Sequence, residues 1–199
     1  VGDKDVVSVL LVGLERLAYR GYDSSGIATI YHGELNTRKE VGKLRTLGAE
    51  LDIHPIKGDL GLGHTRWATH GVPSQENSHP HVDCSGRIAL VHNGIIENYH
   101  ELRHLLQQEG HIFKSDTDTE VMVHLIERYL GPDQNLKDAF LKMLKEVRGT
   151  YAVAVISELA PQGILVARQG SPLVVGLGQD ENFISSDVSA MVGHTRQVV

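Results

Sequence analysis

A cluster of polar side chains follows a strand-like run near residue 66 of this 199-residue chain. The segment reads GHTRWATHG, and its polar end supplies Arg66, Trp67, Thr69 and His70. Clusters at strand ends are typical of sites in which a rigid scaffold presents functional groups. An arginine guanidinium is a planar fork that binds a carboxylate through two hydrogen bonds. The sequence therefore predicts that Arg66 binds a carboxylate, although an arginine here is also consistent with an ordinary surface ion pair.

A second strand-like run, RIALVH, is followed directly by Asn93 and Gly94. An asparagine amide beside a glycine N–H can supply the two donors of an oxyanion hole for a reacting carbonyl. Asn-Gly is also the strongest signal for a two-residue hairpin turn. The residues that follow, IIEN, favour a helix over a returning strand, so we prefer the first interpretation. Together the two stretches predict a substrate with a carboxylate at one end and a reacting carbonyl at the other.

A third polar stretch, from Thr117 to Glu120, matches the helix capping box S/T-x-x-E. Asp118 would then lie in the first turn of a helix, where a carboxylate stabilises the helix dipole. The same position can also face a site, so both a structural and a binding role stay open for Asp118.

The composition is that of one domain with a substantial core, since 41% of the residues are hydrophobic. A net charge of −6 argues against a nucleic-acid partner. No apolar run reaches the roughly 18 residues of a membrane span, and the polar start VGDKD is unlike a signal peptide. The single cysteine, Cys84, excludes an internal disulfide and fits a reducing cytosol.

Hydrophobic periodicity predicts the elements that position these residues. Helices are expected over 3–19, 43–51, 97–109, 117–130 and 135–147, with Asp3 and Asn135 at the first residues of two of them. Strands are expected over 26–31, 35–41, 61–67, 87–92, 151–156, 164–168, 173–177, 183–185 and 196–199. Strands followed by helices and then by strands indicate an α+β fold.

Four segments, in the same order, resemble the glutaminase domain of glucosamine-6-phosphate synthases, which are class II glutamine amidotransferases. They read YRGYDSSGIA, HTRWATHG, VHNGIIENY and SDTDTEV. The resemblance extends from about residue 3 to residue 199. It implies an α+β, N-terminal-nucleophile hydrolase-like fold, a four-layer αββα sandwich with antiparallel sheets. One glutamine amidotransferase domain would occupy residues 1–199.

The resemblance also implies a role for each candidate residue. Asn93 and Gly94 would form the oxyanion hole. The substrate glutamine would be bound by Arg66, Trp67, Thr69, His70 and Asp118, with Arg66 on its α-carboxylate and Asp118 on its α-amino group. Arg20 and Asp23 would support the loop beside the nucleophile.

The nucleophile of this family is a cysteine at the mature N terminus. Its α-amino group, with an ordinary pKa of about 7.7–8.0, can act as the general base. This chain begins VGDKD, and Cys84 lies inside the long loop region with no α-amine beside it. We therefore interpret Cys84 as an ordinary thiol and expect a domain trimmed at both ends, inactive by itself.

In the full enzyme, the resemblance implies hydrolysis of glutamine to glutamate and ammonia. The ammonia would convert fructose 6-phosphate to glucosamine 6-phosphate in a sugar-isomerase domain that is absent here. A homodimer of the full-length enzyme and a cytoplasmic location are expected. The twelve histidines show no zinc-site spacing, and no nucleotide-binding loop is visible. We expect no metal, no cofactor, no nucleic acid and no membrane contact.

Two alternatives stay open. Another class II amidotransferase, such as the purine-pathway phosphoribosyl enzyme or asparagine synthetase, shares the same site logic, although WATH and YDSS favour the aminosugar branch. A non-catalytic glutamine-binding module is the second alternative, and a valine in place of the expected cysteine favours it.

Overall fold

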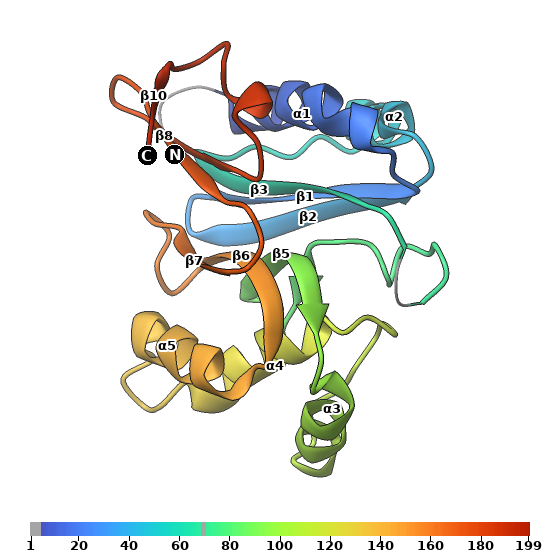
Figure 1. The fold of residues 1–199 in the computed structure, drawn as a ribbon, viewed down its shortest axis with the longest axis vertical. Helices are drawn as coiled ribbons and strands as arrows, with labels where there is room; N and C mark the ends of the chain where they lie inside the picture. The colour runs from blue at the N-terminus through green and yellow to red at the C-terminus, as the bar shows by residue number, and fades with distance from the viewer. Residues whose placement is uncertain (1–4, 69–70) are drawn as a thin grey trace.

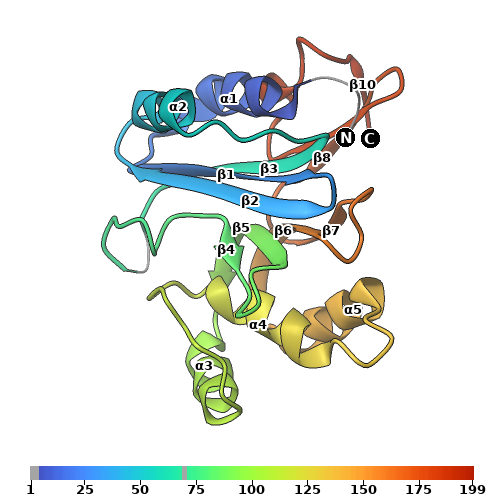
Figure 2. The same cartoon turned by 180° about the vertical axis from the view of Figure 1, so that it is seen from behind.

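The computed structural model describes residues 5–68 and 71–199 as four packed layers (Figures 1 and 2). Two helices cover one sheet, this sheet packs on a second sheet, and further helices cover the outer face of the second. The α-helices are α1 (Val6–Leu17), α2 (Leu44–Ile53), α3 (Tyr99–Gln108), α4 (Glu120–Tyr129) and α5 (Leu136–Glu146). The described residues therefore form the predicted αββα sandwich.

Every pairing between the named strands is antiparallel. The first sheet has the order β2-β1-β3, formed by β1 (Ser24–Tyr31), β2 (Glu34–Val41) and β3 (Leu60–Arg66). The second has the order β4-β5-β6-β7, formed by β4 (His81–Val82), β5 (Ile88–Ile96), β6 (Gly149–Ser157) and β7 (Leu165–Gln169). A small third sheet, β10-β8-β9, adds β8 (Val174–Leu177), β9 (Asn182–Ser185) and β10 (Gln197–Val198) to the two predicted sheets.

Three hydrophobic clusters fill the three spaces between the layers. Because side chains alternate along a strand, neighbouring residues of one strand serve different clusters. In β1, Ile27 packs under α1 and α2 while Ala28 faces the second sheet. In β5, Ala89 faces the first sheet while Leu90 packs against α4 and α5. The central strands β1 and β5 are therefore buried on both faces over most of their length, whereas β2, at the edge of the first sheet, is only partly buried.

The predicted capping box at Thr117 is wrong. The helix begins at Glu120, its N-cap is Thr119, and no side chain caps it. The Glu120 carboxylate instead accepts the N–H groups of Lys114 and Ser115, each at 2.8 Å. It therefore fastens the preceding loop to α4, and Asp118 lies before the helix rather than in its first turn.

The other helix starts are close to those expected. The Asn135 side chain caps α5 by accepting the N–H of Asp138 at 3.1 Å. The Asp5 side chain caps α1, and the predicted cap, Asp3, lies outside the described residues. Both caps satisfy N–H groups that have no partner inside the helix.

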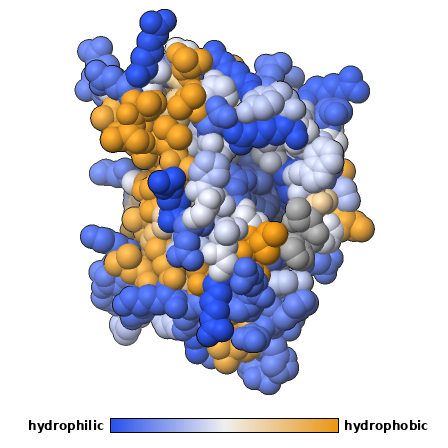
Figure 3. Space-filling model, viewed as in Figure 1, coloured by the Kyte–Doolittle hydropathy of each residue, from blue (hydrophilic) through white to orange (hydrophobic). Residues whose placement is uncertain are grey.

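The surface shown in Figure 3 carries its hydrophobic side chains mainly on the left, over the small third sheet and the neighbouring strands. Leu177, Val192 and Val198 are exposed apolar residues of this C-terminal region. Within the described part of the chain, no helix is both long and apolar enough to cross a membrane.

Candidate active site

A cavity of about 420 Å³ lies where the ends of β3 and β5 approach the start of α4. Its lining includes six of the residues predicted for the site, Arg20, Arg66, Trp67, Asn93, Gly94 and Asp118. Thr69 and His70 lie outside the described residues. The structure thus brings most of the predicted site residues together, although they come from four separate segments of the chain.

Arg66 is the last residue of β3 and is only 5% exposed. Its guanidinium donates from Nη2 to the Gly71 carbonyl at 3.2 Å. Burial lowers the pKa of Arg66, and the nearby carboxylates of Asp23 and Asp118 partly oppose that shift. Since an arginine stays protonated in proteins, the cavity has a buried, fixed positive charge in its wall.

Asp118 lies in the loop just before α4, beside the end of β5 in space, and is only 5% exposed. One carboxylate oxygen, Oδ2, accepts the backbone N–H of Ile96 at 2.7 Å. This bond joins the loop before α4 to the end of β5. A buried carboxylate so close to Arg66 can receive an ammonium group while the guanidinium receives a carboxylate.

Asn93 and Gly94 lie inside β5, which extends to Ile96, rather than after its end. The predicted strand, 87–92, was therefore too short. Gly94 has a φ of +139°, and a Cβ there would collide with the carbonyl oxygen of Thr150 on β6. Only glycine fits this close approach of two strands.

His64 holds the Asn93 amide in one orientation. Its Nε2 donates to the Asn93 Oδ1 at 2.9 Å, since a carbonyl oxygen can only accept. Both N–H donors of the amide are thereby left for other acceptors. The sequence analysis assigned His64 no role, although the histidine lies two residues before Arg66 on the same strand.

His92 joins β5 to the loop beside Asp118. Its Nδ1 accepts from the hydroxyl of Thr119 at 2.9 Å, and its Nε2 donates to the Thr150 carbonyl at 3.3 Å. Burial lowers the pKa of His92, so the ring is neutral at neutral pH and can accept at one nitrogen while donating at the other. This contact keeps Thr119, and with it the start of α4, against the strand that carries Asn93.

The two supporting residues have different contacts. Arg20 binds Asp187 at 2.7 Å and Ser186 at 2.8 Å, which ties the 3-10 turn after α1 (Ala18–Arg20) to the C-terminal region. Asp23 is outside the cavity lining, but its Oδ2 accepts the N–H of Ala68 at 2.6 Å. Asp23 therefore fixes the backbone just after Arg66 and Trp67.

Trp67 is 66% exposed at the mouth of the cavity. Its ring lies so close to Gly21 that a Cβ there would overlap it. Gly21 has a φ of +80°, a conformation that glycine adopts without strain. Because Gly21 has no side chain, the indole ring can pack directly against the backbone of this turn.

A stability test follows from the buried histidines. Burial lowers the pKa of His64 to about 4, while His92 and Arg66 also disfavour its charge. Between pH 6.5 and about 4 the unfolded chain therefore binds a proton that the folded chain does not. The free energy of unfolding falls as the pH falls, and His64 alone is expected to remove about 2 kcal/mol between pH 7 and pH 5.

The matched variant is His64→Gln, because the glutamine Nε2 can still donate to Asn93 but does not titrate. Urea unfolding at pH 7 and pH 5 measures the difference. We expect the pH dependence to shrink in the variant, and an equal loss in both proteins would contradict a neutral, buried His64.

The sequence predicted no metal site, but one group of side chains among the described residues could hold a metal ion. Cys84, His111, His124 and Glu127 lie together, but none of them lines the cavity. This candidate group of the described residues therefore lies outside the cavity.

The comparisons with known proteins agree with this arrangement. The sequence model of the family described as "Glutamine amidotransferase domain" matches residues 24–199. A glutamine–fructose-6-phosphate aminotransferase (isomerizing) of Pyrococcus horikoshii is 48% identical over 199 residues, which are the whole of this chain and 33% of that protein. The enzyme of that name from Methanothermobacter thermautotrophicus is 50% identical over 197 residues, covering 99% of this chain and 33% of its own. The chain thus spans about a third of the length of these curated relatives.

Solved structures share the fold. The glutamine phosphoribosylpyrophosphate amidotransferase from B. subtilis, complexed with ADP and GMP, matches with a TM-score of 0.83 at 30% identity. That match covers 98% of this chain and 42% of the other. A structure titled as the allosteric regulatory enzyme of purine biosynthesis gives 0.82 at 30% identity, over 94% of this chain and 41% of the other. The predicted N-terminal-nucleophile hydrolase-like fold is confirmed. The chain belongs to the glutamine amidotransferase domain family.

Proposed function

We propose that the cavity binds glutamine and that its side-chain amide reacts there. The proximity of buried Arg66 and Asp118 carries this proposal. The carboxylate and ammonium of an amino acid share one carbon, so their binding groups must also lie close together. A guanidinium beside a carboxylate meets that requirement, and the guanidinium offers a bidentate fork. The glutamine side chain would then extend toward Asn93.

In this proposal, Asn93 and Gly94 stabilise the oxyanion formed when a nucleophile attacks the amide. The His64 bond supports this role, because it leaves the Asn93 N–H donors for an acceptor in the cavity. Donors fixed before the reaction need no reorganisation as charge develops, which is the main advantage of an oxyanion hole.

We also propose that a cysteine from a strand outside these 199 residues supplies the nucleophile. Cys84 does not line the cavity. In the described sheets, β3 ends the order β2-β1-β3 and β9 ends the order β10-β8-β9, and residues of both strands line the cavity. Leu10 and Leu14 of α1 and Ala152 and Ala154 of β6 line it as well. These apolar walls and the β3 edge support a buried strand at this position, with its first residue toward Asn93.

For the whole protein, we propose that the ammonia converts fructose 6-phosphate to glucosamine 6-phosphate in a sugar-isomerase domain. The support is the name of the relatives that are 48–50% identical, against 30% for the purine-pathway structures. A cytoplasmic homodimer is part of the same proposal, and the single cysteine fits a reducing compartment.

Arg66→Lys tests the binding site. The substitution keeps the charge but removes the bidentate fork, so the affinity for glutamine should fall by about tenfold to a hundredfold. Isothermal titration of the chain with glutamine measures the loss. Arg87→Lys is the matched control, because Arg87 is a partly exposed arginine outside the cavity that pairs with Glu158.

Affinity that is unchanged in Arg66→Lys would remove Arg66 from the binding site and with it the proposed orientation of glutamine. A second measurement, the release of ammonia from glutamine, distinguishes an enzyme from a non-catalytic glutamine-binding module. Both measurements use the same substrate, so binding and turnover can be compared directly.

A further inference from the structure

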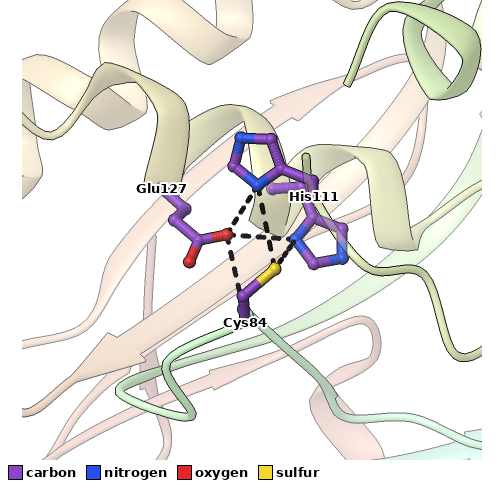
Figure 4. A group of neighbouring side chains, drawn as sticks. Cys84, His111 and Glu127 are labelled. Atoms are coloured by element: carbon purple, nitrogen blue, oxygen red, sulfur yellow. Dashed lines mark hydrogen bonds and ion pairs between the residues drawn. The ribbon is translucent and has the colours of Figure 1, made fainter. Parts of the chain in front are cut away.

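Four side chains outside the cavity converge on one point: Cys84, His111, His124 and Glu127. Figure 4 labels Cys84, His111 and Glu127 of this cluster. Each offers one metal-binding atom, and these atoms all lie within 4.8 Å of one another. Cys84 lies in the turn between β4 and β5, and His111 lies in the loop after α3. His124 and Glu127 lie one turn apart on α4. Three separate segments are thus brought together at this cluster.

The distances within the cluster are those of a four-coordinate metal site. The Cys84 Sγ lies 3.8 Å from the His111 Nδ1 and 3.6 Å from the His124 Nδ1. The Glu127 Oε2 lies 2.8 Å from the first nitrogen and 3.2 Å from the second. A tetrahedral zinc ion with ordinary bond lengths sets separations of about 3.6 Å for sulfur to nitrogen and about 3.3 Å for nitrogen to oxygen. These four separations therefore differ from the tetrahedral values by about 0.5 Å or less.

Neighbouring groups hold these ligands in the way that is common around metal sites. The N–H of Ile112 donates to the Cys84 sulfur at 3.3 Å. The Nε2 of His124 faces the Glu120 carboxylate at 3.6 Å, on the side away from the cluster. Glu120 is itself fixed by the Ser115 hydroxyl at 2.6 Å. The His124 ring is thereby oriented with its Nδ1 toward the sulfur.

Two histidine–glutamate ion pairs are the simpler explanation of the cluster. They account for the contacts of the Glu127 carboxylate. They do not require the cysteine sulfur to lie beside the same two Nδ1 atoms. A metal accounts for both observations, since all four atoms are donors to one ion.

We propose that Cys84, His111, His124 and Glu127 form a structural zinc site. A set of one thiolate, two imidazoles and one carboxylate suits Zn²⁺, whereas Mg²⁺ and Ca²⁺ prefer oxygen ligands throughout. Four protein ligands complete a tetrahedral shell, which is typical of structural rather than catalytic zinc. The ion would join the β4–β5 turn and the loop after α3 to α4.

The reactivity of the single thiol tests this proposal, because Cys84 is the one cysteine of the 199 residues and a thiol reagent therefore reports on it alone. In the metal-free chain, Cys84 is exposed and should react with a chromogenic disulfide. One equivalent of Zn²⁺ should slow the reaction by at least about tenfold, and a chelator should restore it. Mg²⁺ should leave the rate unchanged. An unchanged rate with Zn²⁺ would overturn the proposal without any variant.

Variants that keep the cysteine identify the other ligands. His111→Gln and Glu127→Gln should lose the protection by zinc, whereas His104→Gln, an exposed histidine on α3, should retain it. Co²⁺ should give the visible absorption of a tetrahedral cobalt–thiolate centre in the unmodified chain, and none in Cys84→Ser. Zinc should raise the melting temperature of the unmodified chain and not that of Cys84→Ser. Protection that persists in both His111→Gln and Glu127→Gln would also overturn the four-ligand site.

Discussion

Ammonia release from glutamine is expected when Val1 is preceded by a strand that begins with a cysteine bearing a free α-amine. A strand of about six residues is long enough to lie along β3. The same extension beginning with alanine should bind glutamine but release almost no ammonia. Loss of a catalytic nucleophile can lower kcat by about a million-fold. The α-amine would take the proton of the thiol, and the sulfur would attack the amide carbon while Asn93 and Gly94 stabilise the oxyanion. The C–N bond would then break as the amine returns the proton to the leaving ammonia, and water would hydrolyse the glutamyl thioester to glutamate. A coupled assay for ammonia measures the rate, and titration with glutamine measures binding.

Two controls make the comparison specific. Cys84→Ser in the cysteine-extended chain should keep full activity, since Cys84 does not line the cavity. One extra residue before the cysteine, which moves the α-amine away, should lower the rate sharply. If the alanine form released ammonia as fast as the cysteine form, the nucleophile would lie elsewhere, and Cys84 would be the next residue to test.

The anchors of the site could be predicted from local sequence because each lies in a short, distinctive motif. Arg66 ends β3 in GHTRWATHG, and Asn93 comes directly after the apolar run IALV and His92 within β5. Their convergence in one cavity depends on the packing of β3 against the second sheet, which local pattern does not contain. The resemblance to a known family supplied that information, and the layers of the structure confirm it.

Local rules failed where a distant partner decided the outcome. The strand β5 continues past Asn93 because β6 pairs with it as far as Ile96 and Gly149. Glu120 matched a capping box, but its carboxylate binds the loop at Lys114 and Ser115 instead. In both cases a tertiary contact replaced the local interaction that the motif predicts.

The Cys84 cluster was missed for a related reason. Known zinc motifs place two ligands close together near a turn, whereas here the ligands lie 27, 13 and 3 residues apart along the chain. The pair His124 and Glu127, three residues apart on one helix face, was the one local signal. The other two ligands become neighbours only when α3 and the β4–β5 turn pack beside α4.

The second large effect is expected from Asn93→Ala in the active, cysteine-extended chain. Loss of one oxyanion donor should lower kcat by about a hundredfold to a thousandfold, or about 2.7–4 kcal/mol of barrier. The affinity for glutamine should change little, because the oxyanion exists only during the reaction. Steady-state kinetics and titration with glutamine separate these two quantities.

Asn93→Ala also leaves the His64 Nε2 without its partner, so His64→Gln is the matched comparison. This second variant keeps the Asn93 amide and a donor beside it, and it should lower kcat far less than Asn93→Ala. If Asn93 acted only through packing, both variants would weaken glutamine binding and lower the melting temperature together. A fall in kcat that appears in Asn93→Ala at unchanged affinity and stability would instead identify the amide as a donor to the transition state.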